Sequence, residues 1–254
     1  MDVTDFSEEQ LHRYARHIVL HEIGGPGQQK LKAARVLVIG AGGLGSPAIL
    51  YLAAAGVGTL GVVDDDAVSL SNLQRQVLHG TGEIDRPKVE SAGRAVERIN
   101  PNVSFMPLGV RLTEENADDI IGAYDMVLDG SDNFATRYLV NRVAARLKKS
   151  LVFAAIGRWE GQISVFRPWA GGPCYACVFP ESPAPGLVPA CAEAGVLGAM
   201  TGVVGAIQAV EAVKLITGSG ASLDGRLMLY DALQAETRII KLAKRIGCPV
   251  CGDL

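Results

Sequence analysis

The chain has few cysteines, no marked excess of either charge and no apolar segment at its start. Its 254 residues carry a formal net charge of −3, whereas nucleic-acid binding calls for a basic face. The stretch from Met1 to Asp5 is acidic and lacks the apolar region of a signal peptide. Together these absences predict a cytoplasmic protein whose partners do not include nucleic acid.

Five cysteines are present, and four of them form two CxxC motifs far apart in the sequence. These four are Cys174, Cys177, Cys248 and Cys251. A spacing of two residues lets paired thiolates hold one tetrahedral metal, and four thiolates complete the shell of a structural zinc ion. Two disulfides or a thioredoxin-like redox pair are the alternatives. However, nothing marks the chain as secreted, and redox chemistry does not explain two such motifs. We therefore predict a closed structural zinc site, with Cys191 left over.

Residues 194–210 are nearly all apolar or small, with Gly198 and Gly202 in GxxxG spacing. This run is short for a bilayer, and Glu211 and Lys214 follow it at once. The sequence therefore favours a buried helix that packs closely through its glycines, and no membrane partner is expected.

Short apolar runs alternate with helical patterns between residues 35 and 157. The predicted strands are residues 35–40, 59–64, 103–110, 125–129 and 151–156. The helical patterns are residues 44–55, 87–99, a segment that Thr113 caps, and 134–148; Ser7 begins an N-terminal helix that runs to about residue 21. This alternation is typical of an α/β fold with a doubly wound, mostly parallel Rossmann-like sheet.

The pattern changes after Gly157. Residues 162–166, 226–230 and 236–242 are predicted to form strands of an antiparallel extension of the sheet. No Ser/Gly-rich linker and no repeat separates the two halves. We therefore predict one domain, 1–254, with N-terminal helices in 1–34, a nucleotide-binding half in 35–157 and a second half in 158–254 that carries the zinc motifs.

A glycine-rich turn joins the first predicted strand of the sheet to the next helix. Its glycines are Gly40, Gly42, Gly43 and Gly45. A GxGxxG turn of this kind lets the backbone come close to a phosphate at a helix N-terminus. Asp64, at the end of the second strand, is placed to hydrogen-bond a ribose hydroxyl. By itself the pattern fits an NAD or FAD enzyme as well as an ATP enzyme.

Three further polar clusters favour ATP. The first follows the second strand and consists of Ser71, Asn72, Leu73, Gln74, Arg75 and Gln76. In the second, Lys88 lies at a helix start, where free amides also suit a phosphate. The third, residues 129–133, includes Asp132 and Asn133 and offers oxygen ligands for magnesium. Each cluster alone fits solvated loop charges, but all three follow strand ends, where doubly wound sheets bind ligands. A triphosphate needs this neutralisation, whereas a hydride-transfer site does not.

Together these motifs resemble the MoeB/ThiF/HesA family of adenylyltransferases, which are bacterial relatives of the ubiquitin-activating enzymes. The resemblance rests on GAGGLG, Asp64, SNLQRQ, Pro87-Lys88, GSDN and the two CxxC motifs, and it extends from Arg13 to Cys251. Residues 68–76 and 193–196 are most similar to the MoeB branch. The resemblance implies magnesium- and ATP-dependent adenylation of the C-terminal glycine of a small ubiquitin-fold sulfur carrier, with release of pyrophosphate.

In the MoeB branch the carrier is the small subunit of molybdopterin synthase, which implies a role in molybdenum cofactor biosynthesis. The thiamine sulfur carrier of the ThiF branch is an alternative substrate. An NAD-dependent oxidoreductase and a zinc-stabilised scaffold that binds the carrier without using ATP are alternatives of other classes. The second half, 158–254, would bind the carrier. No rhodanese-type extension follows Cys251, so we expect the sulfur donor to come from elsewhere.

The family pattern also implies residue roles. Arg75 and Lys88 neutralise the phosphates, Asp132 holds magnesium, Asp64 binds the ribose, and Gly43 allows close backbone approach.

Two further roles come from the resemblance. Arg16 matches an arginine that reaches the ATP of the neighbouring subunit, which implies a homodimer; a surface helix charge is the alternative. Cys191 lies in a Pro/Ala-rich loop, where a family cysteine can bond covalently to the activated carrier; a buried structural thiol is the alternative.

Overall fold

In the computed structural model, which describes residues 6–184, 195–252 and 254, eight strands form one sheet in the order β3-β2-β1-β4-β5-β6-β7-β8. The parallel part consists of β3 (Ser104–Leu108), β2 (Thr59–Val63), β1 (Arg35–Ile39), β4 (Met126–Asp129) and β5 (Ser150–Gly157). The antiparallel part consists of β6 (Glu160–Phe166), β7 (Arg226–Asp231) and β8 (Glu236–Lys241). The predicted doubly wound sheet with an antiparallel extension is therefore confirmed.

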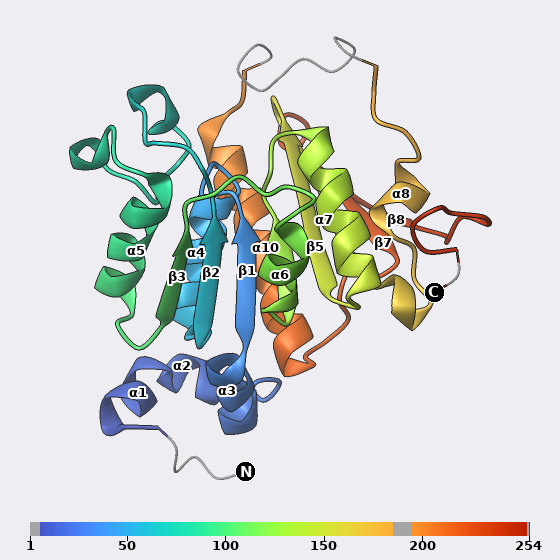
Figure 1. The fold of residues 1–254 in the computed structure, drawn as a ribbon. Coiled ribbons are helices and arrows are strands. Elements are labelled where there is room, and N and C mark those ends of the chain that lie inside the picture. The colour runs from blue at the N-terminus through green and yellow to red at the C-terminus, as the bar shows by residue number, and fades with distance from the viewer. Residues whose placement is uncertain (1–5, 185–194, 253) are drawn as a thin grey trace.

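Helices cover both faces of the parallel part (Figure 1). One face carries α4 (Gly45–Ala55), α5 (Lys88–Ile99) and α10 (Gly198–Thr217), and the other carries α6 (Ala117–Gly122), α7 (Phe134–Arg146) and α8 (Tyr175–Val178). Successive side chains of β1 enter opposite cores: Val36 and Val38 pack on the first face, and Leu37 and Ile39 on the second. Because both faces are buried, the central strands are apolar throughout rather than alternating.

The apolar helix α10 is long and apolar enough, by length and composition, to cross a bilayer. Here it packs against α4, β5 and β6, as the core helix of a folded domain does. A Cβ at Gly205 would lie 2.4 Å from the Leu44 carbonyl oxygen, and one at Gly198 would lie 2.1 Å from the Gln74 carbonyl oxygen. At Gly202, by contrast, an added Cβ would have no atom of the described residues within 4 Å. The predicted close packing is therefore correct at Gly198 but wrong at Gly202.

The N-terminal segment is not the single helix that its sequence predicts. Ser7 forms the predicted capping box with Gln10 and begins α1 (Glu8–Arg13), but α2 (Ala15–Ile18) and α3 (Gly24–Ala33) follow as separate helices. The first break falls at Tyr14, whose ring is buried and whose hydroxyl accepts a hydrogen bond from Asn100 Nδ2 at 2.8 Å. Burial of this ring against a distant part of the chain overrides the local helical pattern.

The helix before β4 also begins later than predicted. α6 starts at Ala117, after Asn116, so Thr113 is not its N-cap. Instead, the Thr113 amide donates to Asn116 Oδ1 at 2.8 Å and closes a turn ahead of the helix.

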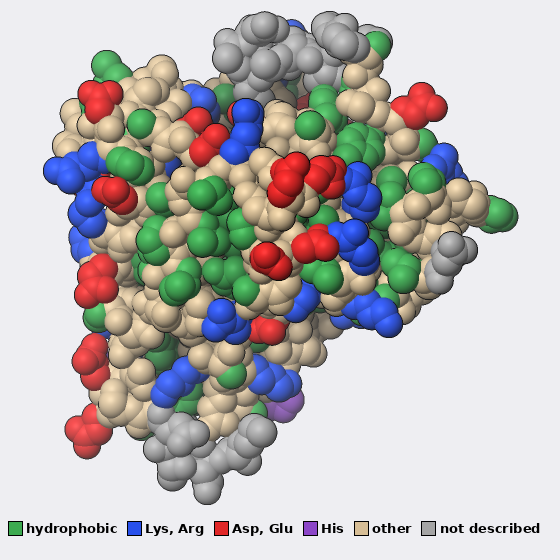
Figure 2. Space-filling view, viewed as in Figure 1, with side chains coloured by type: hydrophobic (Ala, Val, Ile, Leu, Met, Phe, Trp, Pro, Cys, Tyr) green, Lys and Arg blue, Asp and Glu red, His purple; other side chains and the backbone are tan. Residues whose placement is uncertain are grey.

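Acidic and basic side chains are mixed over α6 and α7 on the face seen in Figure 2. Arg142 pairs with Glu114, and Arg146 pairs with Asp118. Exposed pairs of this kind contribute at most about 1 kcal/mol each to stability, so this surface is solvated rather than a source of fold stability.

Candidate functional site

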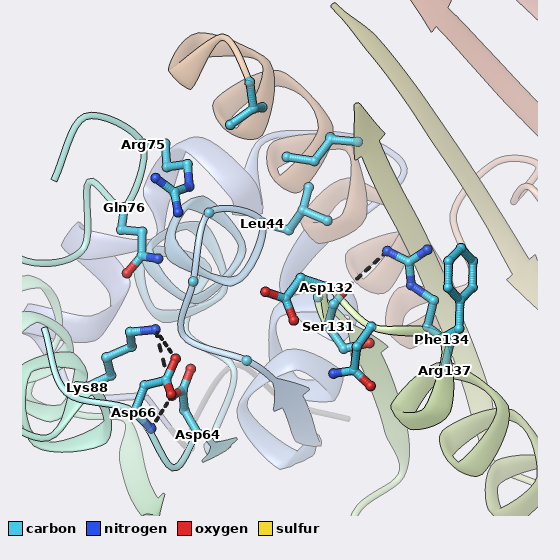
Figure 3. Close-up of a pocket in the computed structure, with 17 residues that line it drawn as sticks. Leu44, Asp64, Asp66, Arg75, Gln76, Lys88, Ser131, Asp132, Phe134 and Arg137 are labelled. Atoms are coloured by element: carbon cyan, nitrogen blue, oxygen red, sulfur yellow. Dashed lines mark hydrogen bonds and ion pairs between the residues drawn. The ribbon is translucent and has the colours of Figure 1, made fainter. Parts of the chain in front are cut away.

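A cavity of about 380 Å³ opens at the carboxyl ends of β1, β2 and β4 (Figure 3). The predicted residues that line it are Gly40, Gly42, Gly43, Asp64, Arg75, Lys88, Asp132 and Asn133. Four more lining residues belong to the predicted motifs without an assigned role, namely Leu44, Gln76, Gly130 and Ser131. The lining residues that were not predicted are Asp66, Phe134, Arg137, Ile156 and Val196. The cavity lies between β1 and β4, the point where the strand order reverses and where doubly wound sheets bind ligands.

The glycine-rich turn brings the N-terminus of α4 to the cavity. Gly40 has φ +90°, a conformation that favours glycine. Gly45 lies so close to the turn that a Cβ there would be 1.8 Å from the Gly40 carbonyl oxygen. No side chain caps α4 within the described part of the chain. The Ser46 amide donates to the Gly42 carbonyl at 2.9 Å and Pro47 has no amide hydrogen, so the amides that remain available lie in the turn just before the helix, where the helix dipole suits a phosphate.

Replacing Gly45 with alanine should abolish this arrangement. The added methyl group cannot coexist with the Gly40 carbonyl, so we expect a loss of about 1–3 kcal/mol of unfolding free energy and the loss of ATP binding. Urea unfolding and nucleotide titration measure the two effects. Gly82→Ala is the matched control, since a Cβ there meets nothing within 4 Å among the described residues. A Gly45→Ala protein that binds ATP normally would contradict the role of the turn.

Lys88 and Asp64 form a charged group on the β2 side of the cavity. Lys88 Nζ lies 2.7 Å from Asp66 Oδ2 and 4.0 Å from Asp64 Oδ1. Asp64 also accepts hydrogen bonds from the Ala41 amide at 2.8 Å and the Asp66 amide at 2.9 Å. Burial raises the pKa of Asp64, although the Lys88 charge and these amides lower it in part. The Asp64 carboxylate is thereby held beside the glycine-rich turn, where a ribose-binding acid is expected.

The polar loop after β2 contributes Arg75 and Gln76. Arg75 Nη1 donates to the Ser71 carbonyl at 3.0 Å, and the Arg75 carbonyl accepts from Thr201 Oγ1 of α10 at 3.0 Å. The loop is therefore tied to the helix that packs behind it. Gln76 is buried, and its Oε1 has no partner within the described residues. The remaining predicted members of this cluster shape the loop and do not line the cavity: Ser71, Asn72, Leu73 and Gln74.

The loop after β4 contributes Asp132 and Asn133. Asn133 Oδ1 accepts from the Thr136 amide at 2.9 Å and caps α7. Asp129, which was also considered as an oxygen ligand, is buried and accepts from the Ser131 amide at 2.9 Å, and burial raises its pKa. Asp132 is therefore the carboxylate of this loop that faces the cavity (Figure 3).

Arg137, at the end of the first turn of α7, was not predicted from the sequence. Its Nη2 donates to the Ser131 carbonyl at 3.0 Å, and its guanidinium lies 5.5 Å from the ring centre of Phe134 and 5.6 Å from that of Phe153. The available signal was its spacing, because residues four apart share a helix face and Asn133 was already predicted to be in the site.

Behind the glycine-rich turn lies His79, which is buried. Its Nε2 is 2.9 Å from the Ala41 carbonyl, which can only accept, so this nitrogen carries the hydrogen. Its Nδ1 is 2.8 Å from Ser91 Oγ on α5. Burial lowers the pKa of His79, which favours the neutral ring. His79 therefore links the turn to the helix that carries Lys88.

The four cysteines of the CxxC motifs meet at one place. The Sγ atoms are 3.9 Å apart for Cys174 and Cys177, 3.7 Å for Cys174 and Cys248, and 3.4 Å for Cys177 and Cys251. A disulfide requires about 2.05 Å, so these sulfur atoms are not bonded to one another. All four lie within 4.8 Å of one another and could hold a metal ion. Burial raises the pKa of Cys174, and a bound cation would favour the thiolate form of this cysteine.

Arg16 does not join the cavity in this chain. It is exposed on α2, which lies beneath the amino ends of the strands, opposite the cavity (Figure 1). Cys191 falls outside the described residues.

The cavity is suited to an anionic ligand rich in hydrogen-bonding groups. Three cations line it: Arg75, Lys88 and Arg137. Three buried side-chain atoms of its wall lack a partner in the described chain, namely Gln76 Oε1, Ser131 Oγ and Arg137 Nε. Buried polar atoms are rarely left unpaired, and unpaired ones in a cavity point to a missing ligand.

Comparison with known proteins agrees with the family resemblance that the motifs indicate. The model of the ThiF family matches residues 14–250. A sulfur carrier protein adenylyltransferase of Thermus thermophilus is 50% identical over 252 residues, covering 98% of this chain and 93% of the relative. SAMP-activating enzyme E1 of Haloferax volcanii is 50% identical over 244 residues, covering 96% of this chain and 90% of that relative. A crystal structure of E. coli MccB with ATP has a TM-score of 0.82 at 20% identity and covers 95% of this chain and 75% of that one, a likeness of fold.

Proposed function

The chain belongs to the ThiF family, as its motifs predict, and we propose that it adenylates the C-terminal glycine of a small ubiquitin-fold sulfur carrier with magnesium and ATP. The observation that carries this proposal is the convergence of the α4 N-terminus, Lys88, Arg75 and Asp132 on one cavity. Two relatives at 50% identity are named as a sulfur carrier protein adenylyltransferase and as an activating enzyme, which supports the same activity. The molybdopterin-synthase small subunit is the carrier we favour, and the thiamine carrier is the alternative.

In the proposed reaction, a carboxylate oxygen of the carrier forms a bond to the α-phosphorus of ATP. The bond from that phosphorus to the bridging oxygen breaks, and pyrophosphate leaves with the electron pair. A carboxylate is already a nucleophile, so the protein needs no general base; its task is positioning and charge stabilisation.

Each part of the cavity has a share in that task. The α4 N-terminus, Arg75 and Lys88 would hold the phosphates, and Asp64 would hold the ribose. Asp132 would hold magnesium, which when bound would neutralise further phosphate charge. The orphaned Gln76 Oε1 gives the wall an acceptor for a hydrogen-bond donor of the nucleotide.

The direct test is pyrophosphate release on incubation with ATP, magnesium and each candidate carrier. We expect release that depends on the carrier and formation of an acyl-adenylate. Enhanced nicotinamide fluorescence on titration with NADH, without carrier-dependent pyrophosphate release, would favour an oxidoreductase instead. Carrier binding without ATP consumption would identify a scaffold.

We propose zinc as the metal of the four-cysteine cluster. In a tetrahedron with Zn–S bonds of about 2.3 Å, the sulfur atoms lie roughly 3.8 Å apart. The distances for three of the sulfur pairs are 3.4 to 3.9 Å, and all four sulfur atoms lie within 4.8 Å of one another. Four cysteines leave no open position for a substrate, so the ion would join the α8 region to the C-terminal turn rather than take part in catalysis.

A cytoplasmic homodimer is the proposed working unit, with Arg16 reaching the partner's nucleotide. An apolar hollow of about 470 Å³ beside α2, α4 and α10 supports a subunit contact there. Tyr51, Val210 and Val19 are exposed by 60%, 55% and 73% in or beside it, and exposed apolar groups in one place mark interfaces.

Mixing two inactive variants should test this arrangement. In a heterodimer of Arg16→Ala and Lys88→Ala chains, one of the two sites has an intact Lys88 and receives an intact Arg16 from the other chain. We expect the mixture to regain carrier-dependent pyrophosphate release. Because one of the two sites in each heterodimer is intact, the rate per heterodimer should reach at most about half of the rate of the unmodified dimer. A mixture that stays inactive while sedimentation shows mixed dimers would refute the exchange of Arg16.

Removing the remaining cysteine should leave adenylation intact. Cys191→Ala should form acyl-adenylate at the normal rate, because attack of a carboxylate on ATP involves no sulfur chemistry. If Cys191 captures the activated glycine, an adduct sensitive to reductant or hydroxylamine should form in the unmodified protein and be absent from Cys191→Ala. A folded, metal-loaded variant that cannot release pyrophosphate would show that this division of roles is wrong.

A further inference from the structure

Arg137 lies across the cavity from the other two cations. In Figure 3, Lys88 and Asp66 are on one side, Arg137 and Phe134 are on the other, and Asp132 lies between them. Lys88 and Arg75 come from the elements after β2, whereas Arg137 comes from α7, after β4. The cavity therefore has two separate centres of positive charge.

The guanidinium of Arg137 is held in place and, although its charge lowers the pKa of the buried Asp129 in part, it forms no ion pair within the described residues. Nη2 is fixed by the Ser131 carbonyl, and the rings of Phe134 and Phe153 lie beside the group. Among the described residues, no carboxylate lies within the 4.0 Å of an ion pair with Arg137. Nε is buried and has no hydrogen-bond partner in the described chain. A fixed arginine with an unpaired Nε is prepared to receive an anion, and its planar donors match either a carboxylate or a phosphate.

Adenylation of a carboxylate creates a need for such a residue. The reaction brings a carboxylate against a triphosphate, and both are anionic. In phosphoryl transfer the attacking and leaving oxygens lie roughly in line on opposite sides of the phosphorus. Cations that bind the leaving phosphates therefore cannot also bind the incoming carboxylate. The carboxylate needs a positively charged group on the opposite side of the α-phosphorus.

The surroundings of Arg137 fit a peptide end. Ile156, at the end of β5, and Val196 line the same cavity and provide apolar contact. Val196 pairs with Arg158 in an isolated parallel bridge, and the Leu197 amide donates to the Arg158 carbonyl at 3.1 Å. The cavity wall here is thus extended backbone beside apolar side chains, next to the guanidinium.

We propose that Arg137 binds the C-terminal carboxylate of the protein substrate and holds it for attack on ATP. This inference rests on the proposed function and identifies the side of the cavity that the acceptor uses.

The test compares two forms of the carrier that supports pyrophosphate release, one ending in the natural carboxylate and one in a carboxamide. Binding is measured with α,β-methylene ATP present, so that no reaction occurs. The unmodified enzyme should bind the carboxylate form about 10- to 100-fold more tightly, as expected for a charge-assisted hydrogen-bonded pair. Arg137→Gln should bind both forms equally, and Arg137→Lys, which keeps the charge but loses the planar fork, should discriminate to an intermediate degree.

Affinity for ATP in the absence of carrier should change by less than about threefold in both variants, because Arg75 and Lys88, on the opposite side of the cavity, would bind the nucleotide phosphates. Arg142→Gln is the matched control, since Arg142 is on the same helix but pairs with Glu114 at the surface. Unchanged discrimination in Arg137→Gln, or a parallel loss of ATP affinity, would overturn the inference. If Arg137→Gln does not fold, the test rests on Arg137→Lys: reduced discrimination between the two carrier forms would support the inference, and unchanged discrimination would overturn it. Absence of pyrophosphate release with every carrier would instead reject the proposed function itself, before Arg137 is tested.

Discussion

Replacing Lys88 or Arg75 with alanine should lower the rate of carrier-dependent pyrophosphate release by about 100- to 1,000-fold, the usual cost of losing a charge-stabilising contact. Both cations line the cavity beside the N-terminus of α4. Negative charge on the phosphates must be neutralised in the transition state, and no nearby group can replace either cation without moving. The effect should appear at saturating ATP and carrier, in a coupled pyrophosphate assay.

The two variants differ in their structural consequences. Among the residues that the structure describes, the Arg75 side chain makes one hydrogen bond, to the Ser71 carbonyl, so its removal should hardly affect the fold. Lys88 pairs with Asp66 and lies near the mostly buried Asp64, so Lys88→Ala should raise the pKa of Asp64 further and lower stability moderately. Folding should therefore be followed by circular dichroism in both.

A neighbouring cation provides the control. Arg94 is on the same helix as Lys88 but pairs with Glu83 at the surface. Arg94→Ala should keep turnover within about twofold of normal, because exposed pairs contribute little. Near-normal turnover in Arg75→Ala or Lys88→Ala would remove that residue from the proposed site.

Loss of the metal site should produce the second large effect. Cys174→Ser should lose the bound zinc and about 3–5 kcal/mol of unfolding free energy, since metal binding contributes directly to folding and loss of a metal lies at the upper end of single-substitution effects. For a domain of this size, that corresponds to a decrease of roughly 10 °C in the melting temperature. Elemental analysis should find one zinc ion per chain in the unmodified protein and less than one in the variant.

Cys191→Ser is the matched control, because it removes the one cysteine that lies outside the two CxxC motifs. It should keep both the zinc and the melting temperature. Prolonged treatment of the unmodified protein with a strong chelator should reproduce the loss of stability seen in Cys174→Ser. A metal-free protein with normal stability would exclude a structural zinc.

The parts of the site that sequence analysis predicted share one property: each depends on local chain geometry. The glycine-rich turn is predictable because Gly45 has no room for a Cβ beside the Gly40 carbonyl, a contact made within one turn. Asp64 and Asp132 are predictable because they follow strand ends, and the carboxyl ends of parallel strands share one edge of a sheet. The CxxC spacing identifies a metal site without any knowledge of the fold between the motifs.

The features that were missed depend on contacts between distant parts of the chain. Tyr14 interrupts the N-terminal helix because its ring is buried and bonded to Asn100. His79 became visible only when the fold brought Ala41 and Ser91 to its two ring nitrogens. Single-residue patterns contain no information about such partners.

The sequence by itself determined the fold class, the family and the motifs that supply most of the cavity lining, because turn chemistry, strand alternation and metal-ligand spacing are local properties. Only the tertiary structure decided which polar residues of a cluster face the cavity: Arg75 does, whereas Ser71 does not. It also placed Arg137 opposite Lys88, and left Arg16 beneath the amino ends of the strands, opposite the cavity. Those outcomes follow from the packing of helices and strands on one another, in which the position of a side chain depends on every element that it touches.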